Sequence, residues 1–245
     1  MSTIRRRTFL KGLSALALAT PAMAQFGSLK NLGGAGASNN MPALPMPTSL
    51  FIEYIAIATG LGVEGAHKLL ELYPPDKIAE IGKLCEQYNE LRKQTKPGEL
   101  DQSSMNCASA IGAETAKLDA AMATVDIEKT KALHAAHKKL GLCLLADAFA
   151  SLNVKNYIDS LQNDIKSAAH NPMKASSIQG MKAQLQTLTV VATAIPSQIN
   201  SFGAVHGIVK KIAEAHKITL ADDPKPESVH SEDGLKAAGK NSDVP

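Results

Sequence analysis

The sequence has no Trp and only four Tyr and five Phe among its 245 residues. So few aromatic side chains argue against the stacking platforms that bind single-stranded nucleic acid. The formal charge is +3, but the first 24 residues carry four cations and no acid, so the rest of the chain has a net charge of 3 − 4 = −1. Sequence-independent nucleic-acid binding requires clustered cations that neutralise phosphates. We therefore expect no nucleic-acid partner.

The short motifs of common catalytic and metal sites are also missing. The chain contains no Gly-x-Ser-x-Gly, phosphate-binding loop, His-Glu-x-x-His or paired-cysteine metal motif. We therefore expect no enzymatic activity. An alternative enzyme would use Asp147 or Glu114 as acid or base, and this interpretation ranks last because the sequence shows no second polar group for Asp147.

The first 24 residues have the composition of an export signal. Arg6 and Arg7 are followed by Thr-Phe-Leu-Lys, a short apolar stretch, and the small-x-small cleavage site formed by Ala22 and Ala24. The arginine pair with its Phe-Leu-Lys resembles the twin-arginine motif of bacterial and archaeal proteins that are exported already folded. The resemblance implies a periplasmic or secreted protein that begins at Gln25. We expect no transmembrane segment in the mature chain.

Composition divides the mature chain into three parts. Residues 25–47 are rich in Gly, Asn, Ser and Pro, which is typical of a flexible linker. Residues 220–245 carry prolines and charges and few large apolar groups, so we expect a disordered tail. The apolar residues of 48–219 recur at helical spacing and predict a single helical bundle domain.

Period and helix-breaking residues predict seven helices in this domain. Their approximate ranges are 49–72, 76–94, 103–124, 127–152, 154–169, 175–195 and 197–217. Residues 188–195 are rich in β-branched side chains and could form a strand, but no partner strand is visible, so a helix is favoured. Short connections make neighbouring helices antiparallel. The fold class is therefore all-α: a single-domain antiparallel bundle of about six to seven helices with disordered termini.

The predicted helices 103–124 and 127–152 are joined by very few residues. In such an antiparallel hairpin, residues whose numbers sum to about 250 lie at the same height. Cys107 and Cys143 meet this condition on facing apolar stripes, and an oxidising compartment makes them candidates for a disulfide, with Cys85 left over. The alternative is that all three cysteines are small buried hydrophobic residues.

The same register brings Glu114 next to His134 and His137. Two imidazoles and one carboxylate form a cluster that can bind a divalent transition metal in a helical bundle. A hydrogen-bonded or solvent-edge Glu–His pair, with His134 in solvent, is the favoured alternative. The register also places Asp147 near the start of helix 103–124, where free N–H groups favour an anion.

Two functions follow from these observations. The first is an exported helical bundle without enzymatic activity that binds a partner protein or a small apolar ligand. The alternative is a periplasmic metal-binding bundle that uses His134, His137 and Glu114.

Overall fold

A computed structural model describes residues 46–95, 100–170 and 176–241. The predicted signal segment, its Arg6, Arg7, Ala22 and Ala24, and all but the last two residues of the predicted linker lie outside these ranges. The described residues form helices and no strands, which confirms the all-α bundle. The helices are α1 (Thr48–Leu70), α2 (Pro75–Gln94), α3 (Gln102–Thr115), α4 (Ile127–Ala169), α5 (Ile178–Ala215) and α6 (Glu232–Asn241), with short 3-10 helices η3 (Ala120–Met122) and η5 (Pro226–Val229).

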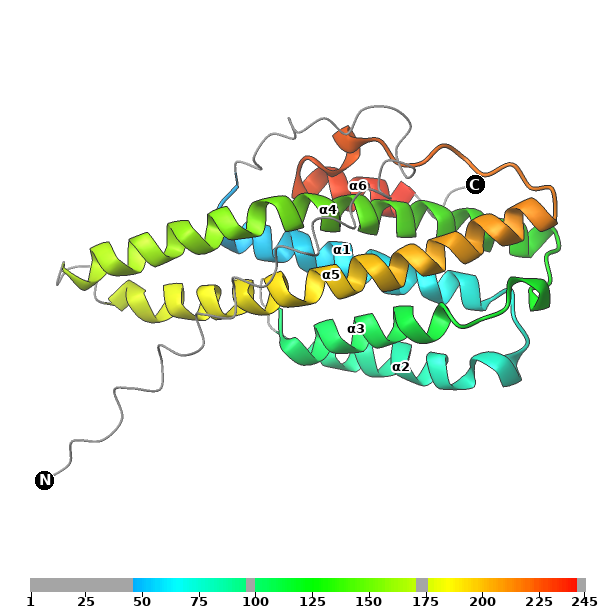
Figure 1. Ribbon diagram of the computed structural model, residues 1–245, viewed down its shortest axis with the longest axis horizontal. Helices are drawn as coiled ribbons and strands as arrows, with labels where there is room; N and C mark the ends of the chain where they lie inside the picture. Colours follow the sequence, from blue (N-terminus) through cyan, green and yellow to red (C-terminus); the bar gives the residue numbers. More distant parts are fainter. Residues whose placement is uncertain (1–45, 96–99, 171–175, 242–245) are drawn as a thin grey trace, which may run out of the picture. The chain divides into compact units, whose positions relative to one another are not determined.

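The long helices α4 and α5 pack side by side, and α1 contacts each of the other α-helices (Figure 1). Helix α4 packs against α5 and α1, and α3 packs against α5, α2 and α1. Helix α6 lies against α1 and α4. The core contains the residues that spacing predicts on α5, because Phe202, Val205, Val209 and Ile212 are all 0 % exposed.

Local sequence sets the helix starts. Asp101 caps α3 by accepting a hydrogen bond from the Ser104 backbone N–H at 2.7 Å. Asp126 caps α4 in the same way, from the Lys129 N–H at 2.8 Å. Pro75 occupies the first position of α2, where a missing N–H costs nothing. Side-chain caps of this kind are worth about 1 kcal/mol each.

Two predicted helix ends are absent. Helix α4 continues through Asn153, because no proline or glycine interrupts the chain there. Helix α5 continues through Pro196, although an interior proline costs about 3 kcal/mol. The flanking Ile195 and Gln198 are buried, and the packing of α5 offsets this cost. Residues 188–195 are helical, as predicted.

The glycines of α1 allow close helix packing. A Cβ added at Gly62 would lie 2.6 Å from the Phe202 ring and 2.7 Å from Cys143 Sγ, and one at Gly65 would lie 2.8 Å from Leu140 Cγ. Such distances exclude any larger residue without movement of its neighbours. These glycines let α4 and α5 approach the α1 backbone.

The predicted hairpin between residues 103–124 and 127–152 is wrong. Helix α3 ends at Thr115, and the following connection is held against the end of α1, where Thr124 N–H donates to Leu72 O at 2.9 Å. Among the described helices, α3 packs on α1, α2 and α5 rather than on α4. Residue numbers that sum to 250 therefore do not share a height.

The predicted disulfide between Cys107 and Cys143 is not formed, and both cysteines are free and buried, like Cys85. Cys107 Sγ donates to Leu84 O of α2 at 3.4 Å, whereas Cys143 Sγ donates to Asp147 of its own helix. The two thiols lie on helices that do not face each other. All three cysteines are small buried residues, as the alternative interpretation expects.

The expectation of a disordered tail is wrong for Pro226–Asn241, which forms η5 and α6. Lys217 adopts a left-handed conformation with φ 56°, and Ile218 N–H donates to Ala213 O at 2.8 Å, so α5 ends in a reversal. The chain then returns along the bundle. We call residues 218–241 the C-terminal strap; its Val229 and Leu235 are 0 % exposed.

Two helices, α1 and α5, are long and apolar enough to cross a membrane by length and composition. In α1, 67 % of the apolar window is buried inside the bundle, and in α5 the share is 39 %. Core helices of soluble proteins pass the same test, so the expected absence of a transmembrane segment stays a prediction.

Candidate functional site

Only one member of the predicted metal cluster, His137, lies in the cluster that the structure forms. Glu114 lies on α3 and pairs with Lys117 at 2.6 Å. His134 is half-buried on α4, one turn before His137. Because α3 does not pack on α4, the carboxylate and the two imidazoles are not brought together by a hairpin.

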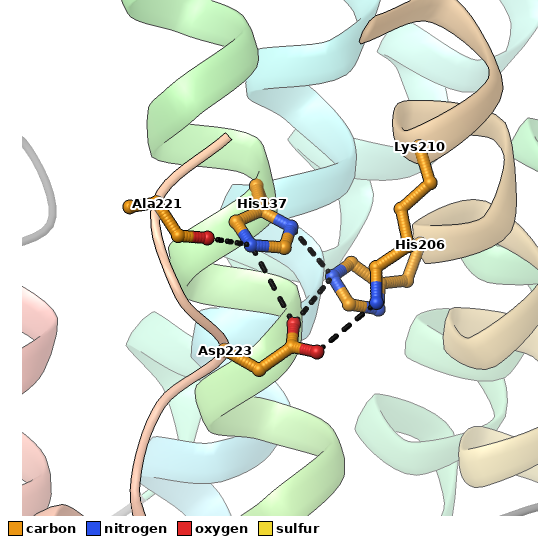
Figure 2. A network of polar contacts seen from close by, with 5 residues as sticks. All are labelled: His137, His206, Lys210, Ala221 and Asp223. Atoms are coloured by element: carbon orange, nitrogen blue, oxygen red, sulfur yellow. Dashed lines mark hydrogen bonds and ion pairs between the residues drawn. The ribbon is translucent and has the colours of Figure 1, made fainter. Parts of the chain in front are cut away.

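His137 instead meets His206 of α5 and Asp223 of the strap (Figure 2). The two rings stack with centroids 4.8 Å apart, and both side chains are almost fully buried. Asp223 Oδ1 lies 3.5 Å from His137 Nε2 and 3.8 Å from His206 Nε2. One possible ligand atom from each residue lies within 4.8 Å of the other two. We call these three residues the histidine cluster.

Hydrogen bonds fix where the imidazole protons lie. Ala221 O can only accept, so His137 Nε2, at 2.9 Å, carries the proton and donates to it. In a neutral ring His137 Nδ1 then accepts, and His206 Nε2 donates to it at 2.8 Å. His206 Nδ1 is left as a bare nitrogen, buried and without a hydrogen-bond partner among the described residues.

The surroundings keep both rings neutral. Burial lowers the pKa of His137, against the opposing effects of Asp223 and the Ala221 carbonyl. Burial, with His137 and Lys210, lowers the pKa of His206 to about 3. A neutral imidazole is the form that binds metal ions, so neither ring has to lose a charge-carrying proton first.

Lys210 orients the carboxylate of Asp223. Its ammonium lies 3.1 Å from Oδ2 of Asp223. Lys210 reaches this oxygen because it lies on α5, one turn after His206. The other oxygen, Oδ1, faces the imidazoles and accepts no hydrogen bond. Lys210 therefore holds one oxygen while the second stays available to a ligand, as outer groups do around metal sites.

Two separations within the cluster are those of a metal site. Ligand atoms about 2.1 Å from a tetrahedral zinc ion lie about 3.4 Å from one another. The separations of 3.5 and 3.8 Å between Asp223 Oδ1 and the two Nε2 atoms are close to this value. Two imidazoles and one carboxylate are ligands that suit divalent transition metals.

A second buried polar group lies on α4 at Asp147, which is 0 % exposed. Its Oδ2 accepts from Cys143 Sγ at 3.6 Å, and its Oδ1 has no hydrogen-bond partner among the described residues. Burial raises the pKa of Asp147 to about 7. Burial, then the nearby Asp147, raises the pKa of Tyr54, whose hydroxyl donates to Val229 O of the strap at 3.0 Å. We call Tyr54, Cys143 and Asp147 the carboxyl cluster. The prediction that Asp147 lies near the start of α3 is therefore wrong.

Sequence reasoning missed His206 and Asp223. His206 had a visible signal, because it lies between Phe202 and Val209 on the apolar stripe of its helix. Asp223 had none, since it belongs to a segment whose composition resembles an unfolded tail.

Comparison with known proteins gives no match: no family model, no curated protein and no solved structure is similar to this chain. The chemistry of the histidine cluster therefore rests on its geometry.

Proposed function

We propose that this protein is an exported, non-enzymatic helical bundle that binds a divalent transition metal through His137, His206 and Asp223. The observation that carries this proposal is the convergence of three ligand-type side chains, two of them buried, from two helices and the strap. Zinc fits best, because it accepts two imidazoles and one carboxylate in a tetrahedron whose fourth position is taken by water.

Metal binding has a local cost. If both Nε2 atoms bind the ion, the hydrogen bonds from His206 to His137 and from His137 to Ala221 are lost, and each ring proton moves to Nδ1. Two neutral hydrogen bonds contribute about 1 kcal/mol each. Zinc sites with four protein ligands bind with apparent energies several times larger, so a site with three ligands can still offset this cost.

Zinc titration of the mature chain by calorimetry tests the proposal. We expect His206→Gln and Asp223→Asn to weaken binding by about 10–100-fold, because each removes one ligand. His134→Gln and Glu114→Gln are matched controls that remove the other two residues of the sequence-predicted cluster, and they should change affinity little. Loss of binding in these controls, with retention in the first pair, would favour the sequence-predicted cluster instead.

Export is proposed on the first 24 residues alone. We expect the exported chain to begin at Gln25 and the double change Arg6→Lys, Arg7→Lys to block export. N-terminal sequencing of protein from the periplasm or medium checks both points, and exported protein that retains Met1 would contradict the proposal. A partner protein or a small apolar ligand stays a prediction.

A further inference from the structure

A groove outside the histidine cluster opens between α1, α2 and the first turns of α4. Its volume of about 560 Å³ lies in the range of small-molecule sites. Helix α2 packs mainly on α3, while α4 packs on α5 and α1, so the space between α2 and α4 is left open. The lining residues are Val63, Glu64, His67, Lys68, Glu71, Cys85, Asn89, Glu128, Lys131, Ala132, Ala135 and Lys139.

Lys139 is the most unusual of these residues, because it carries a charge yet is only 4 % exposed. Its ammonium lies 2.7 Å from a carboxylate oxygen of Glu64, whose side chain is 61 % exposed. A buried charge needs a partner of opposite sign. Since Glu64 reaches in from the solvent side, it can move aside for a ligand anion that takes its place.

The groove also offers charges of both signs at its rim. Glu128 and Lys131 line it one turn apart on α4, and neither side chain forms an ion pair or hydrogen bond with a described residue. The lining contains three carboxylates and three ammonium groups, of which Lys68 pairs with Glu71 and Lys139 with Glu64. A balanced lining of this kind matches a ligand that itself carries one charge of each sign.

We propose that this groove binds a small zwitterion, namely a free amino acid or a short peptide. The ligand carboxylate contacts Lys139 and Lys131, and the ligand ammonium contacts Glu64 and Glu128. Apolar lining contributed by Val63, Cys85, Ala132 and Ala135 receives an uncharged side chain. This site shares no residue with the histidine cluster, so it does not depend on metal binding.

The dipeptide L-alanyl-L-leucine is the probe for the test, followed by ¹⁵N NMR titration of the mature chain. We expect shifts confined to residues 63–71, 85–89 and 128–139. The N-acetylated and the C-amidated dipeptides each lack one charge and should bind about tenfold more weakly or worse. Equal binding of a blocked form, shifts centred elsewhere, or no shifts with 10 mM dipeptide, roughly the weakest affinity a specific site would show, would overturn the proposal.

Variants locate the contact within the groove. Lys139→Met should weaken binding of the dipeptide at least tenfold, and Lys155→Met, a change at an exposed lysine outside the groove, should leave it unchanged. If Lys139→Met does not fold, the exposed pair Glu128→Gln and Lys131→Met gives the same test, because neither residue belongs to the core. Unchanged affinity in this double variant would also contradict the proposal.

Discussion

The histidine cluster and the carboxyl cluster both place polar groups in the interior of the bundle, at His137 and Asp147 of α4. The two clusters differ in their exposure to solvent. The first includes Asp223, whose side chain is 30 % exposed, and a lysine that reaches solvent. The second is closed, and its Asp147 has 0 % exposure. The first cluster is therefore open to solvent at one side, whereas the second is enclosed.

Burial shifts the pKa values of the two clusters in opposite directions. It lowers the pKa of both histidines and raises that of Asp147, because in each case the neutral form is favoured in a medium of low polarity. The strap contacts both clusters, through Ala221 and Asp223 at the first and through Val229 at the second. Docking of the strap therefore completes one site and covers the other.

Removal of residues 220–245 tests whether the strap supports both clusters, and we expect the largest effect here. Two fully buried side chains, Val229 and Leu235, contribute about 1.5–3 kcal/mol each, and the hydrogen bonds to Ala221 O and Val229 O about 1 kcal/mol each. The total of roughly 5–8 kcal/mol corresponds to a fall in Tm of at least about 10 °C, measured by calorimetry.

Point variants in the full-length chain test whether the loss of stability comes from the buried side chains of the strap or from the shortening of the chain. Val229→Ala with Leu235→Ala should reproduce most of the loss, whereas Lys225→Ala, at an exposed position, should not. A truncated chain that keeps its Tm would show that the strap contributes nothing to either cluster.

The pH dependence of Asp147→Asn isolates the carboxyl cluster. The folded pKa of about 7 lies above the unfolded value of 3.8, so the folded state binds the proton more tightly, and stability is lost as pH rises from about 4 to 7. Asparagine resembles the protonated form and does not titrate. The variant should therefore gain on the order of 4 kcal/mol relative to the parent chain between pH 4 and pH 8.

Urea unfolding of both chains across this pH range provides the measurement. Taking the difference between the chains removes the titration of all other groups, including the histidines. A difference that stays constant with pH would mean that Asp147 is ionised in the folded protein and that the two clusters do not differ as described.

Helices, core and fold class could be predicted from the sequence, because they depend on local period. Phe202 and Val205 were placed in the core by spacing alone, and they are fully buried. Helix ends were harder to predict at Pro196, where tertiary packing outweighs a local preference. The arrangement of α3 and α4 could not be derived, since it depends on contacts between distant residues, such as the packing of both helices on α1 and α5 and the hydrogen bond from Thr124 to Leu72.

The histidines of the candidate site also carry a signal in the local sequence, whereas its aspartate does not. His137 and His206 lie on the apolar stripes of their helices, where a polar side chain is unusual and indicates a buried polar contact. Asp223 joins them only because the strap is ordered by a few distant contacts, above all those of Val229 and Leu235. The composition of a segment is an average, so it does not reveal that two large apolar residues, Val229 and Leu235, become buried against the bundle.

Steric probes at two glycines sharpen the comparison at the histidine cluster. A Cβ at Gly141 would lie 2.7 Å from Pro224 Cδ, next to Asp223, whereas one at Gly207 would meet no atom within 4 Å. Gly207→Ala should gain up to about 1 kcal/mol from helix propensity. Gly141→Ala should instead lose about 1–2 kcal/mol, because the strap has to move.

Zinc affinity provides the second measurement for this pair. Displacement of Pro224 shifts Asp223, so Gly141→Ala should weaken zinc binding, and Gly207→Ala should not. If both variants bind zinc like the parent chain, Asp223 does not act as a ligand, although the two histidines could still do so.

The last prediction concerns the hydrogen bond from Tyr54 to Val229 O, which joins the carboxyl cluster to the strap. Tyr54→Phe leaves the buried Val229 carbonyl without its donor, which costs about 1–2 kcal/mol. Tyr157→Phe is the matched control, because its hydroxyl also donates to a backbone carbonyl, that of Met46 at 2.9 Å, but in a partly exposed place. Its ring keeps the stack on Phe51, so we expect a loss of roughly 0.5 kcal/mol. Amide hydrogen exchange distinguishes the two further: Tyr54→Phe should speed exchange in α6, because its acceptor Val229 belongs to the strap, whereas the acceptor Met46 of Tyr157 does not. Equal effects of the two variants would mean that the hydrogen bond from Tyr54 does not help to hold the strap.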